Sequence, residues 1–183
     1  QAQRMQAIVE DLLTLSTLES SPGAGPTIVN MSELLQRARQ QAEALSNGRH
    51  AFEWHIDEGL DLLGSAGELT SAVSNLLTNA VRYTPDGGQI SVYWEADEEG
   101  AAHYRVQDTG IGIAARHIPR LTERFYRVDR GRSRAVGGTG LGLAITKHVA
   151  MRHDAALDIE SEPGKGSTFS LRFPPERVSR NPN

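Results

Sequence analysis

The stretch Asn75-Leu76-Leu77-Thr78-Asn79-Ala80-Val81-Arg82-Tyr83 has the spacing of a helix with one polar face. Asn75 and Asn79 are four residues apart and Arg82 follows three later, so the three side chains share one side. Amide oxygens can ligate a hard cation, and a guanidinium can bind phosphate through two hydrogen bonds. Taken alone, this pattern is better explained by amides on a solvated helix face.

A second segment, Asp108-Thr109-Gly110-Ile111-Gly112, follows a run with the alternation of a strand. Its two glycines allow the backbone to approach a flat ligand closely. The Asp108 carboxylate can accept a hydrogen bond from an exocyclic amine, the strong donor on adenine. A simple turn closed by the aspartate side chain is the alternative, and the segment alone does not exclude it.

A third segment, Gly137-Gly138-Thr139-Gly140-Leu141-Gly142-Leu143, opens a helix. Glycine-rich backbone at a helix N-terminus favours anions. The segment is not a dinucleotide fingerprint, because a long irregular loop precedes it rather than a strand. It is not a P-loop either, because Gly-x-x-x-x-Gly-Lys-Ser/Thr occurs nowhere in the chain. Gly164-Lys165-Gly166-Ser167-Thr168 is better explained as the turn of a hairpin.

Helical and strand-like patterns alternate around these three segments. Apolar residues at three- and four-residue spacing predict helices, and alternation bounded by turn residues predicts strands. The expected helices are 3–19, 30–47, 65–82, 117–125 and 141–152, and the expected strands are 51–56, 61–63, 90–94, 104–106, 157–159 and 169–173. Helices interleaved with hairpins predict an α+β fold: a two-layer α/β sandwich of one mixed sheet with three helices on one face, preceded by a single helix.

The first predicted helix is separated from the rest by the breaker Ser21-Pro22-Gly23-Ala24-Gly25-Pro26. Its apolar stripe fits a helix of a bundle, and the alternative is a terminal helix packed on its own domain. The residues of the stripe are Met5, Ile8, Val9, Leu12, Leu13 and Leu15.

Length and composition restrict the remaining possibilities. The 183 residues suffice for one well-packed domain and a short appendage. The net charge of −4 gives no broad basic surface, so no nucleic-acid partner is expected. Cysteine is absent, which excludes disulfides, thiolate metal sites and cysteine catalysis. No apolar run approaches the roughly 20 residues that span a bilayer. Because the chain opens at Gln1 without an initiator Met or a signal peptide, we expect a fragment of a longer protein.

In this order, the segments resemble the Bergerat-type ATP-binding fold, and more closely the catalytic domain of sensor histidine kinases. The resemblance covers residues 30–174. The matching stretches are Asn75–Tyr83 (N box), Asp108–Gly112, Gly138–Leu143 and Gly164–Phe169 (three glycine boxes) and Glu123–Asp129 (F box). It implies the C-terminal part of the second dimerisation helix in 1–21, a linker in 22–29, the catalytic ATP-binding domain in 30–176 and a tail in 177–183.

The resemblance also implies a site for ATP and Mg²⁺. On the base side, Asp108 would bind the adenine amine and Tyr83 would flank the nucleotide. The implied wall of the base pocket consists of Gly110, Gly112 and Ile113, with Thr168 closing it.

On the phosphate side, the resemblance implies that Asn79 ligates Mg²⁺ with support from Asn75. Arg82 and Arg127 would be the catalytic residues, with Arg127 reaching the γ-phosphate. Ala114–Val136 would form a mobile lid anchored by Phe125. The remaining residues implied to contact the phosphates are Arg130, Thr139, Gly140, Leu141 and Gly142.

Phosphotransfer is favoured over hydrolysis by the residue one turn before the proposed metal ligand. The ATPase relatives of the fold have a glutamate there that activates water, whereas this chain has Asn75, an amide that cannot act as a base. The phosphoacceptor histidine of the family precedes an acidic residue and usually a Thr-Pro or related turn. Only His153 of the six histidines precedes an acid, Asp154, and it lacks that continuation. The chain is therefore expected to bind ATP without phosphorylating itself.

The resemblance implies two partners, the phosphoacceptor-His dimerisation domain of the same protein and a response regulator. The parent would be a membrane-anchored homodimer, and this chain part of its cytoplasmic portion. The first helix and the N-box region are similar to those of phosphate-regulon sensors. Two alternatives stay open: a degenerate, non-catalytic interaction module, and a hydrolytic ATPase of the same fold.

Overall fold

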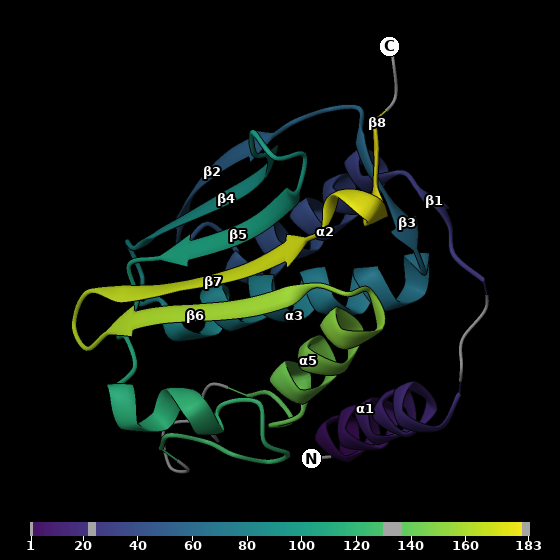
Figure 1. Cartoon of the computed structure of the whole chain (residues 1–183). Coiled ribbons are helices and arrows are strands. Elements are labelled where there is room, and N and C mark those ends of the chain that lie inside the picture. The colour runs from purple at the N-terminus through teal and green to yellow at the C-terminus, as the bar shows by residue number, and fades with distance from the viewer. Residues whose placement is uncertain (1, 22–24, 130–136, 181–183) are drawn as a thin grey trace.

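The computed structural model describes residues 2–21, 25–129 and 137–180 (Figure 1). The helices are α1 (Ala2–Ser20), α2 (Met31–Ser46), α3 (Ala66–Tyr83) and α5 (Gly142–Arg152), with short 3₁₀ helices η1 (Ala115–Arg120) and η2 (Pro175–Arg177). The strands are β1 (Thr27–Val29), β2 (Ala51–Ile56), β3 (Leu60–Gly64), β4 (Gln89–Ala96), β5 (Ala102–Asp108), β6 (Ala156–Glu162), β7 (Gly166–Phe173) and β8 (Val178–Arg180).

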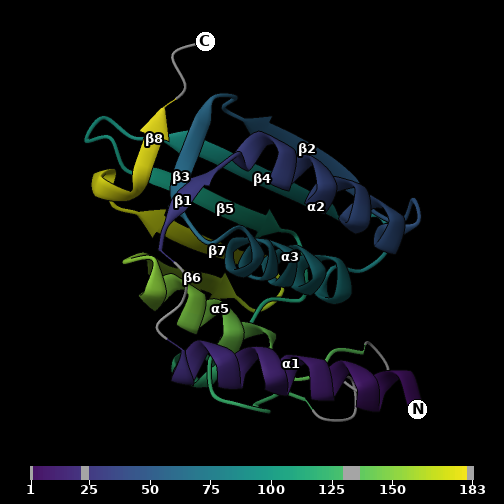
Figure 2. The ribbon, with the colours of Figure 1, turned by 90° about the vertical axis from the view of Figure 1, so that its right-hand side faces the viewer.

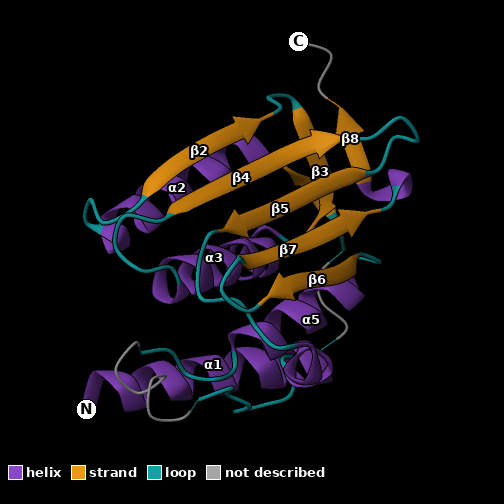
Figure 3. Ribbon diagram, turned by 90° about the vertical axis from the view of Figure 1, so that its left-hand side faces the viewer, coloured by secondary structure: helices purple, strands orange, loops and turns teal. Residues whose placement is uncertain are grey.

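The main sheet has five strands in the order β2-β4-β5-β7-β6. β2 runs parallel to β4 and the other neighbours are antiparallel, so the sheet is mixed. Helices α2, α3 and α5 lie together on one of its faces (Figure 3). This confirms the predicted two-layer α+β sandwich with a preceding helix.

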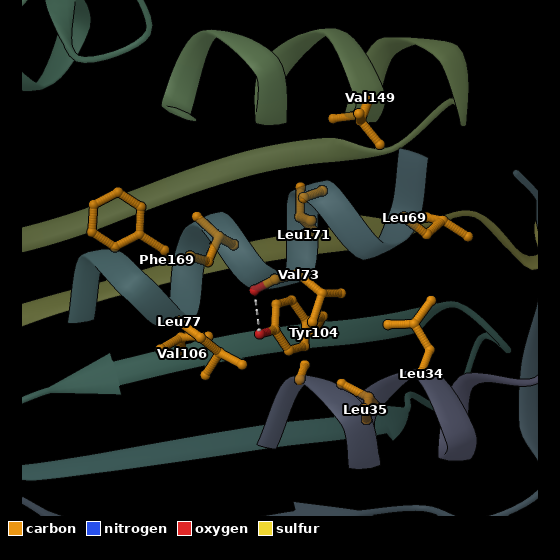
Figure 4. Packing of buried hydrophobic residues seen from close by; sticks show 14 of the residues in the cluster. Leu34, Leu35, Leu69, Val73, Leu77, Tyr104, Val106, Val149, Phe169 and Leu171 are labelled. Carbon is orange, nitrogen blue, oxygen red and sulfur yellow. Dashed lines mark hydrogen bonds between the residues drawn. The ribbon is translucent and has the colours of Figure 1, made fainter. Parts of the chain in front are cut away.

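The core lies between the sheet and the helices, where alternate residues of β5 and β7 are buried (Figure 4). Tyr104 on β5 is fully buried, and its hydroxyl donates to the Val73 carbonyl of α3 at 3.1 Å. Trp94 on β4 is also fully buried, and its indole N–H donates to the Leu60 carbonyl at 2.9 Å. Each such aromatic side chain fills the core while its polar atom keeps a partner.

The two predicted N-caps are present. The Asn30 side chain accepts from the Glu33 amide at 3.1 Å, and Ser65 accepts from the Glu68 amide at 3.4 Å. These bonds satisfy backbone donors that the first helical turn leaves without partners. They fix where α2 and α3 begin, and α3 carries the asparagines of the candidate site.

The structure corrects the prediction of a single sheet. A second sheet, in the order β1-β3-β8, pairs Thr27–Val29 and Val178–Arg180 with β3. The first of these strands lies within the predicted linker and the second within the predicted tail. Strands of three residues are too short to show the alternation by which strands are recognised in a sequence.

The helix predicted at 117–125 is also shorter than expected. The structure has a 3₁₀ helix, Ala115–Arg120, which contains Pro119. Proline has no N–H for a helical hydrogen bond and clashes with the preceding turn, so the α-helix does not extend through it.

Helix α1 packs on α5, on the side of the molecule away from the sheet (Figure 2). Leu15 and Leu18 are 0% and 6% exposed in this contact, and burial of such a side chain contributes about 1.5–3 kcal/mol. The apolar side chains Met5, Val9 and Leu13 are exposed. In the described part of the chain, no helix is both long and apolar enough to cross a membrane.

Candidate functional site

A cavity of about 340 Å³ opens between the end of α3, the tips of β5 and β7, and the segment after η1. This volume lies within the range of roughly 300–1,000 Å³ typical of small-molecule sites. Among the residues predicted to contact a nucleotide, those that line it are Asn79, Tyr83, Asp108, Gly112, Ile113, Arg127 and Gly140. Segments far apart in the sequence therefore meet at one cavity.

Asp108 is the last residue of β5, and its carboxylate borders the cavity. Its Oδ1 accepts from the Gly110 amide at 2.9 Å and from the Ser167 amide at 3.2 Å. Desolvation by burial raises the pKa of Asp108, and these two amide bonds act in the opposite direction. Because Ile113 and Phe169 supply apolar wall beside it, the arrangement suits a flat base that carries an amine.

The two glycines after Asp108 allow close backbone packing. Gly112 has φ +72°, and a Cβ there would lie 2.0 Å from the Glu162 carbonyl oxygen. A Cβ on Gly110 would lie 2.4 Å from the Tyr83 carbonyl oxygen. Gly112 lines the cavity, whereas Gly110 is not among its lining residues in the described part of the chain. Gly110 instead lets the turn rest against the end of α3.

The structure places Thr168 away from the cavity. Successive side chains of a strand point to opposite faces, and in β7 it is Ser167 and Phe169 that line the cavity. Thr168 is paired with Gln107, an exposed residue of β5, on the outer face of the sheet. Thr168 itself therefore does not line this cavity, whereas its two neighbours on β7 do.

Among the described residues, eight that line the cavity were not predicted: Ile111, Val128, Asp129, Ser167, Phe169 and the three residues Leu121, Tyr126 and Leu143. Tyr126 lies under the guanidinium of Arg120, 4.4 Å from the ring centroid, and its hydroxyl bonds to His117. Apolar and aromatic residues in a sequence indicate a core as readily as a ligand wall, so no signal distinguished these three.

The polar side chains on one face of α3 have different surroundings. Asn79 lines the cavity, while Asn75 donates from Nδ2 to the Gly142 carbonyl at 3.1 Å and so joins α3 to the start of α5. Arg82 lies near the glycine segment, since a Cβ on Gly138 would be 3.2 Å from its Nη1 and 3.9 Å from Arg127 Nη2. Two guanidinium groups thus lie close to the backbone that precedes α5.

The glycine segment is held by bonds from the segment after η1. The Phe125 amide donates to the Gly140 carbonyl at 2.8 Å, and Arg127 donates to the Gly138 carbonyl. The Phe125 side chain is 51% exposed, so the described structure attaches this residue through its backbone rather than by burial of its ring. Arg130 and the end of the predicted lid lie outside the described residues.

The remaining residues predicted to contact the phosphates, Thr139, Leu141 and Gly142, lie at the start of α5. The Thr139 hydroxyl accepts from the Leu141 amide at 3.2 Å and donates to Asp11 of α1 at 2.5 Å. Leu141 is fully buried, and Gly142 accepts the Asn75 bond. Backbone amides at a helix start and two nearby guanidinium groups form a suitable environment for an anion.

The donor set also fits a magnesium nucleotide. Within residues 2–21, 25–129 and 137–180, no group of three or more His, Cys, Asp or Glu side chains could hold a metal ion. A magnesium ion at this site would therefore depend on the Asn79 amide oxygen, water and the phosphates of a ligand, which is a common arrangement for Mg²⁺.

Comparison with known families agrees with this geometry. A family model for histidine kinase-, DNA gyrase B- and HSP90-like ATPases matches residues 64–177. The chain belongs to this family. The match contains all of α3, β4, β5, α5, β6 and β7, and hence every element that contributes to the cavity.

Among members of this family, the chain is similar in sequence to sensor histidine kinases. The chain is 53% identical over 182 residues to the phosphate regulon sensor protein PhoR of Pseudomonas aeruginosa, covering 98% of this chain and 41% of PhoR. It is 38% identical over 179 residues to the sensor-like histidine kinase SenX3 of Mycolicibacterium smegmatis, covering 95% of this chain and 46% of SenX3. The chain thus spans less than half the length of these curated relatives.

Solved structures show the same fold. A solved chain of the mycobacterial sensor histidine kinase MprB superposes with a TM-score of 0.72 at 28% identity, over 81% of this chain and 97% of the solved one. ShkA, solved in complex with AMPPNP, gives 0.82 at 24% identity over 98% of this chain and 37% of ShkA. The matches confirm the predicted ATP-binding catalytic domain of a sensor histidine kinase, similar to the phosphate-regulon sensors.

Proposed function

We propose that this chain binds ATP with Mg²⁺ and presents the γ-phosphate to a histidine on a dimerisation domain of the same protein, for relay to a response-regulator aspartate. The parent would be a membrane-anchored homodimer, with this chain in its cytoplasmic portion. The observation that carries the proposal is the cavity in which the Asp108 carboxylate, the Asn79 amide and the Arg127 guanidinium meet.

In this proposal the base lies between the apolar walls, and its amine donates to Asp108. Arg127 and Arg82, whose guanidinium groups both lie close to Gly138, neutralise charge on the phosphates. Magnesium would supply further charge neutralisation there, with Asn79 as its protein ligand. Phosphoryl transfer depends mainly on positioning and electrostatic stabilisation, which these groups can provide.

The role of Asn75 supports transfer rather than hydrolysis. A hydrolase of this fold needs a base one turn before the metal ligand, and an amide cannot accept the proton of water at neutral pH. Here Asn75 instead uses its Nδ2 to bind the Gly142 carbonyl, a structural contact with the start of α5.

The test is calorimetric titration of Mg-ATP into the chain and into Asp108→Asn. Loss of the charged acceptor should weaken binding by roughly 10- to 100-fold, because a hydrogen bond to a charged group contributes about 1.5–3 kcal/mol. Asp86→Asn is a matched control, since Asp86 is exposed and its nearest cation, Arg49, is 3.8 Å away on the surface. Repeating the titration in EDTA measures the dependence on Mg²⁺.

Other results would point to the alternatives. No binding by the unchanged chain would favour a non-catalytic interaction module. Sustained release of inorganic phosphate without any acceptor protein would favour a hydrolytic ATPase. Equal affinity of Asp108→Asn and the unchanged chain would contradict the assigned base site.

A further inference from the structure

The side chain of Asp11 on helix α1 contacts the glycine segment that opens α5. Asp11 lies in the middle of α1, and its Oδ2 accepts from the Thr139 hydroxyl at 2.5 Å. The two residues are 128 positions apart in the chain. Thr139 lies in the glycine segment that opens α5, between Gly138 and Gly140, so this contact joins α1 to the proposed phosphate site.

Further contacts hold α1 in this position. Arg152 of α5 donates to the Leu18 carbonyl at 3.2 Å and to the Ser21 carbonyl at 2.5 Å. Glu19 forms an ion pair with Arg124, in the segment after η1, and its carboxylate lies 3.8 Å from His148 Nε2. Together with the buried Leu15 and Leu18, these contacts seat the C-terminal half of α1 on α5.

The position of Asp11 is unfavourable for a bound triphosphate. Arg82 and Arg127, the groups that would bind the phosphates, both lie close to Gly138, the residue before Thr139. A carboxylate here repels any phosphate that approaches the same cations, and in a partly buried site such repulsion is screened less than in water. Asp11 also occupies the Thr139 hydroxyl donor, which then cannot bond to a phosphate oxygen.

We infer that Asp11 makes docking of α1 and binding of phosphate-bearing nucleotides mutually antagonistic. With α1 docked, the carboxylate lies beside the glycine segment proposed to bind the phosphates; with nucleotide bound, Asp11 is displaced from Thr139. The coupling is reciprocal, because each event changes the free energy of the other by the same amount. This inference rests on the proposed function, since it concerns the same nucleotide site.

The test compares Asp11→Asn with the unchanged chain by calorimetric titration of Mg-ATP, ADP and adenosine. Asparagine has the same shape but no charge, so we expect Mg-ATP to bind roughly tenfold more tightly, ADP to gain less, and adenosine to be unchanged. Asp11→Ala, which also removes the bond to Thr139, should bind Mg-ATP at least as tightly as Asp11→Asn. Circular dichroism confirms that each variant is folded.

Glu10→Gln is the matched control. Glu10 is the neighbouring acid on α1, is exposed, and bonds to Gln6 one turn earlier. The substitution makes the same change in net charge away from Thr139, so ATP affinity should stay at the unchanged value. A gain as large as that of Asp11→Asn would overturn the inference, because it would show a general charge effect.

Hydrogen exchange provides a readout independent of affinity. Saturating Mg-ATP should increase exchange of α1 amides in the unchanged chain, whereas saturating adenosine should not. Equal or weaker ATP affinity in Asp11→Asn, or an equal gain for adenosine, overturns the inference while leaving the proposed function intact. If neither ATP nor adenosine binds the unchanged chain or Asp11→Asn, the proposed function and the inference both fail.

Discussion

The Asp108 carboxylate is fixed in place by the protein itself. It accepts from the Gly110 and Ser167 amides, which belong to two different elements, so its orientation does not depend on a ligand. Preorganisation of this kind lowers the cost of binding, because the acceptor is already oriented. The same two bonds explain why Asp108 can be buried at all, since a buried carboxylate without partners is strongly unfavourable.

His153 predicts a dependence of stability on pH at the scale of one residue. Its Nδ1–H donates to the Val149 carbonyl and its Nε2 accepts from the Ser65 amide, which requires the neutral ring. Desolvation by burial lowers the pKa of His153 below its usual value of about 6.5. The unfolded chain therefore binds more protons than the folded one as pH falls through about 6.5, and the free energy of unfolding decreases in that range.

This effect is measured from urea unfolding midpoints at several pH values between 7.5 and 5.5. His153→Gln removes the titrating ring and can still accept from the Ser65 amide, so its midpoint should change less with pH. An unchanged pH dependence in this variant would show that another group is responsible. Asp108 acts in the opposite direction, because its raised pKa makes the folded state bind more protons at acid pH.

At the scale of elements, strand alternation predicts different effects for two neighbouring residues. Phe169 faces the helices and lines the cavity, whereas Thr168 is on the outer face of β7. Phe169→Ala should cost about 3–5 kcal/mol of stability through the void it leaves, and should weaken Mg-ATP binding. Thr168→Ala should change stability by less than about 0.5 kcal/mol and leave ATP affinity unaltered. Thermal unfolding and calorimetry of both variants test this; a large loss of affinity in Thr168→Ala would instead support a contact of Thr168 with the nucleotide.

The sequence allowed the elements to be predicted wherever they are long or capped. Helices α2 and α3 were predicted because Asn30 and Ser65 begin them and an apolar stripe follows each. The strands β1 and β8 were missed, because each has three residues and is defined by its pairing with β3 rather than by a local pattern. For these four elements, prediction succeeded where the determinants are local and failed where they are tertiary.

The candidate site shows the same division. Asp108, Asn79 and Arg127 were predicted because each lies in a segment that resembles a motif of the family. Which face of β7 meets the cavity depends on register, and a shift of one residue exchanges Thr168 for its neighbours. The contact of Asp11 with Thr139 joins residues 128 positions apart, and no local pattern reveals it.

At the scale of the whole molecule, the surroundings of the six histidines indicate that the chain alone should not phosphorylate itself. All six lie in the described part of the chain, and each contacts another residue there. His50 and His153 are buried. The ring nitrogens of His50 bond to the Ser46 hydroxyl and the Thr84 carbonyl. Those of His153 bond to the Val149 carbonyl and the Ser65 amide. His55 stacks on Tyr93 with ring centroids 4.9 Å apart. The other contacts are those of His103 with Asp97, His117 with Tyr126, and His148 with Glu19.

We therefore expect no acid-labile phosphate on the chain after incubation with Mg-ATP, although ATP binds. Addition of the parent protein's histidine-bearing dimerisation domain should produce phosphohistidine on that domain. Arg127→Ala should reduce the rate of this phosphorylation by about 10³-fold or more, because removal of an arginine that stabilises phosphoryl transfer has an effect of this size. Radiolabelled γ-phosphate followed on both polypeptides measures this.

Stoichiometric label on the chain alone would contradict the prediction that it does not phosphorylate itself, and substitution of each histidine in turn would then identify the acceptor. If label reaches the added domain at an unchanged rate in Arg127→Ala, the γ-phosphate role assigned to Arg127 is wrong, while ATP binding and transfer between the two polypeptides still hold.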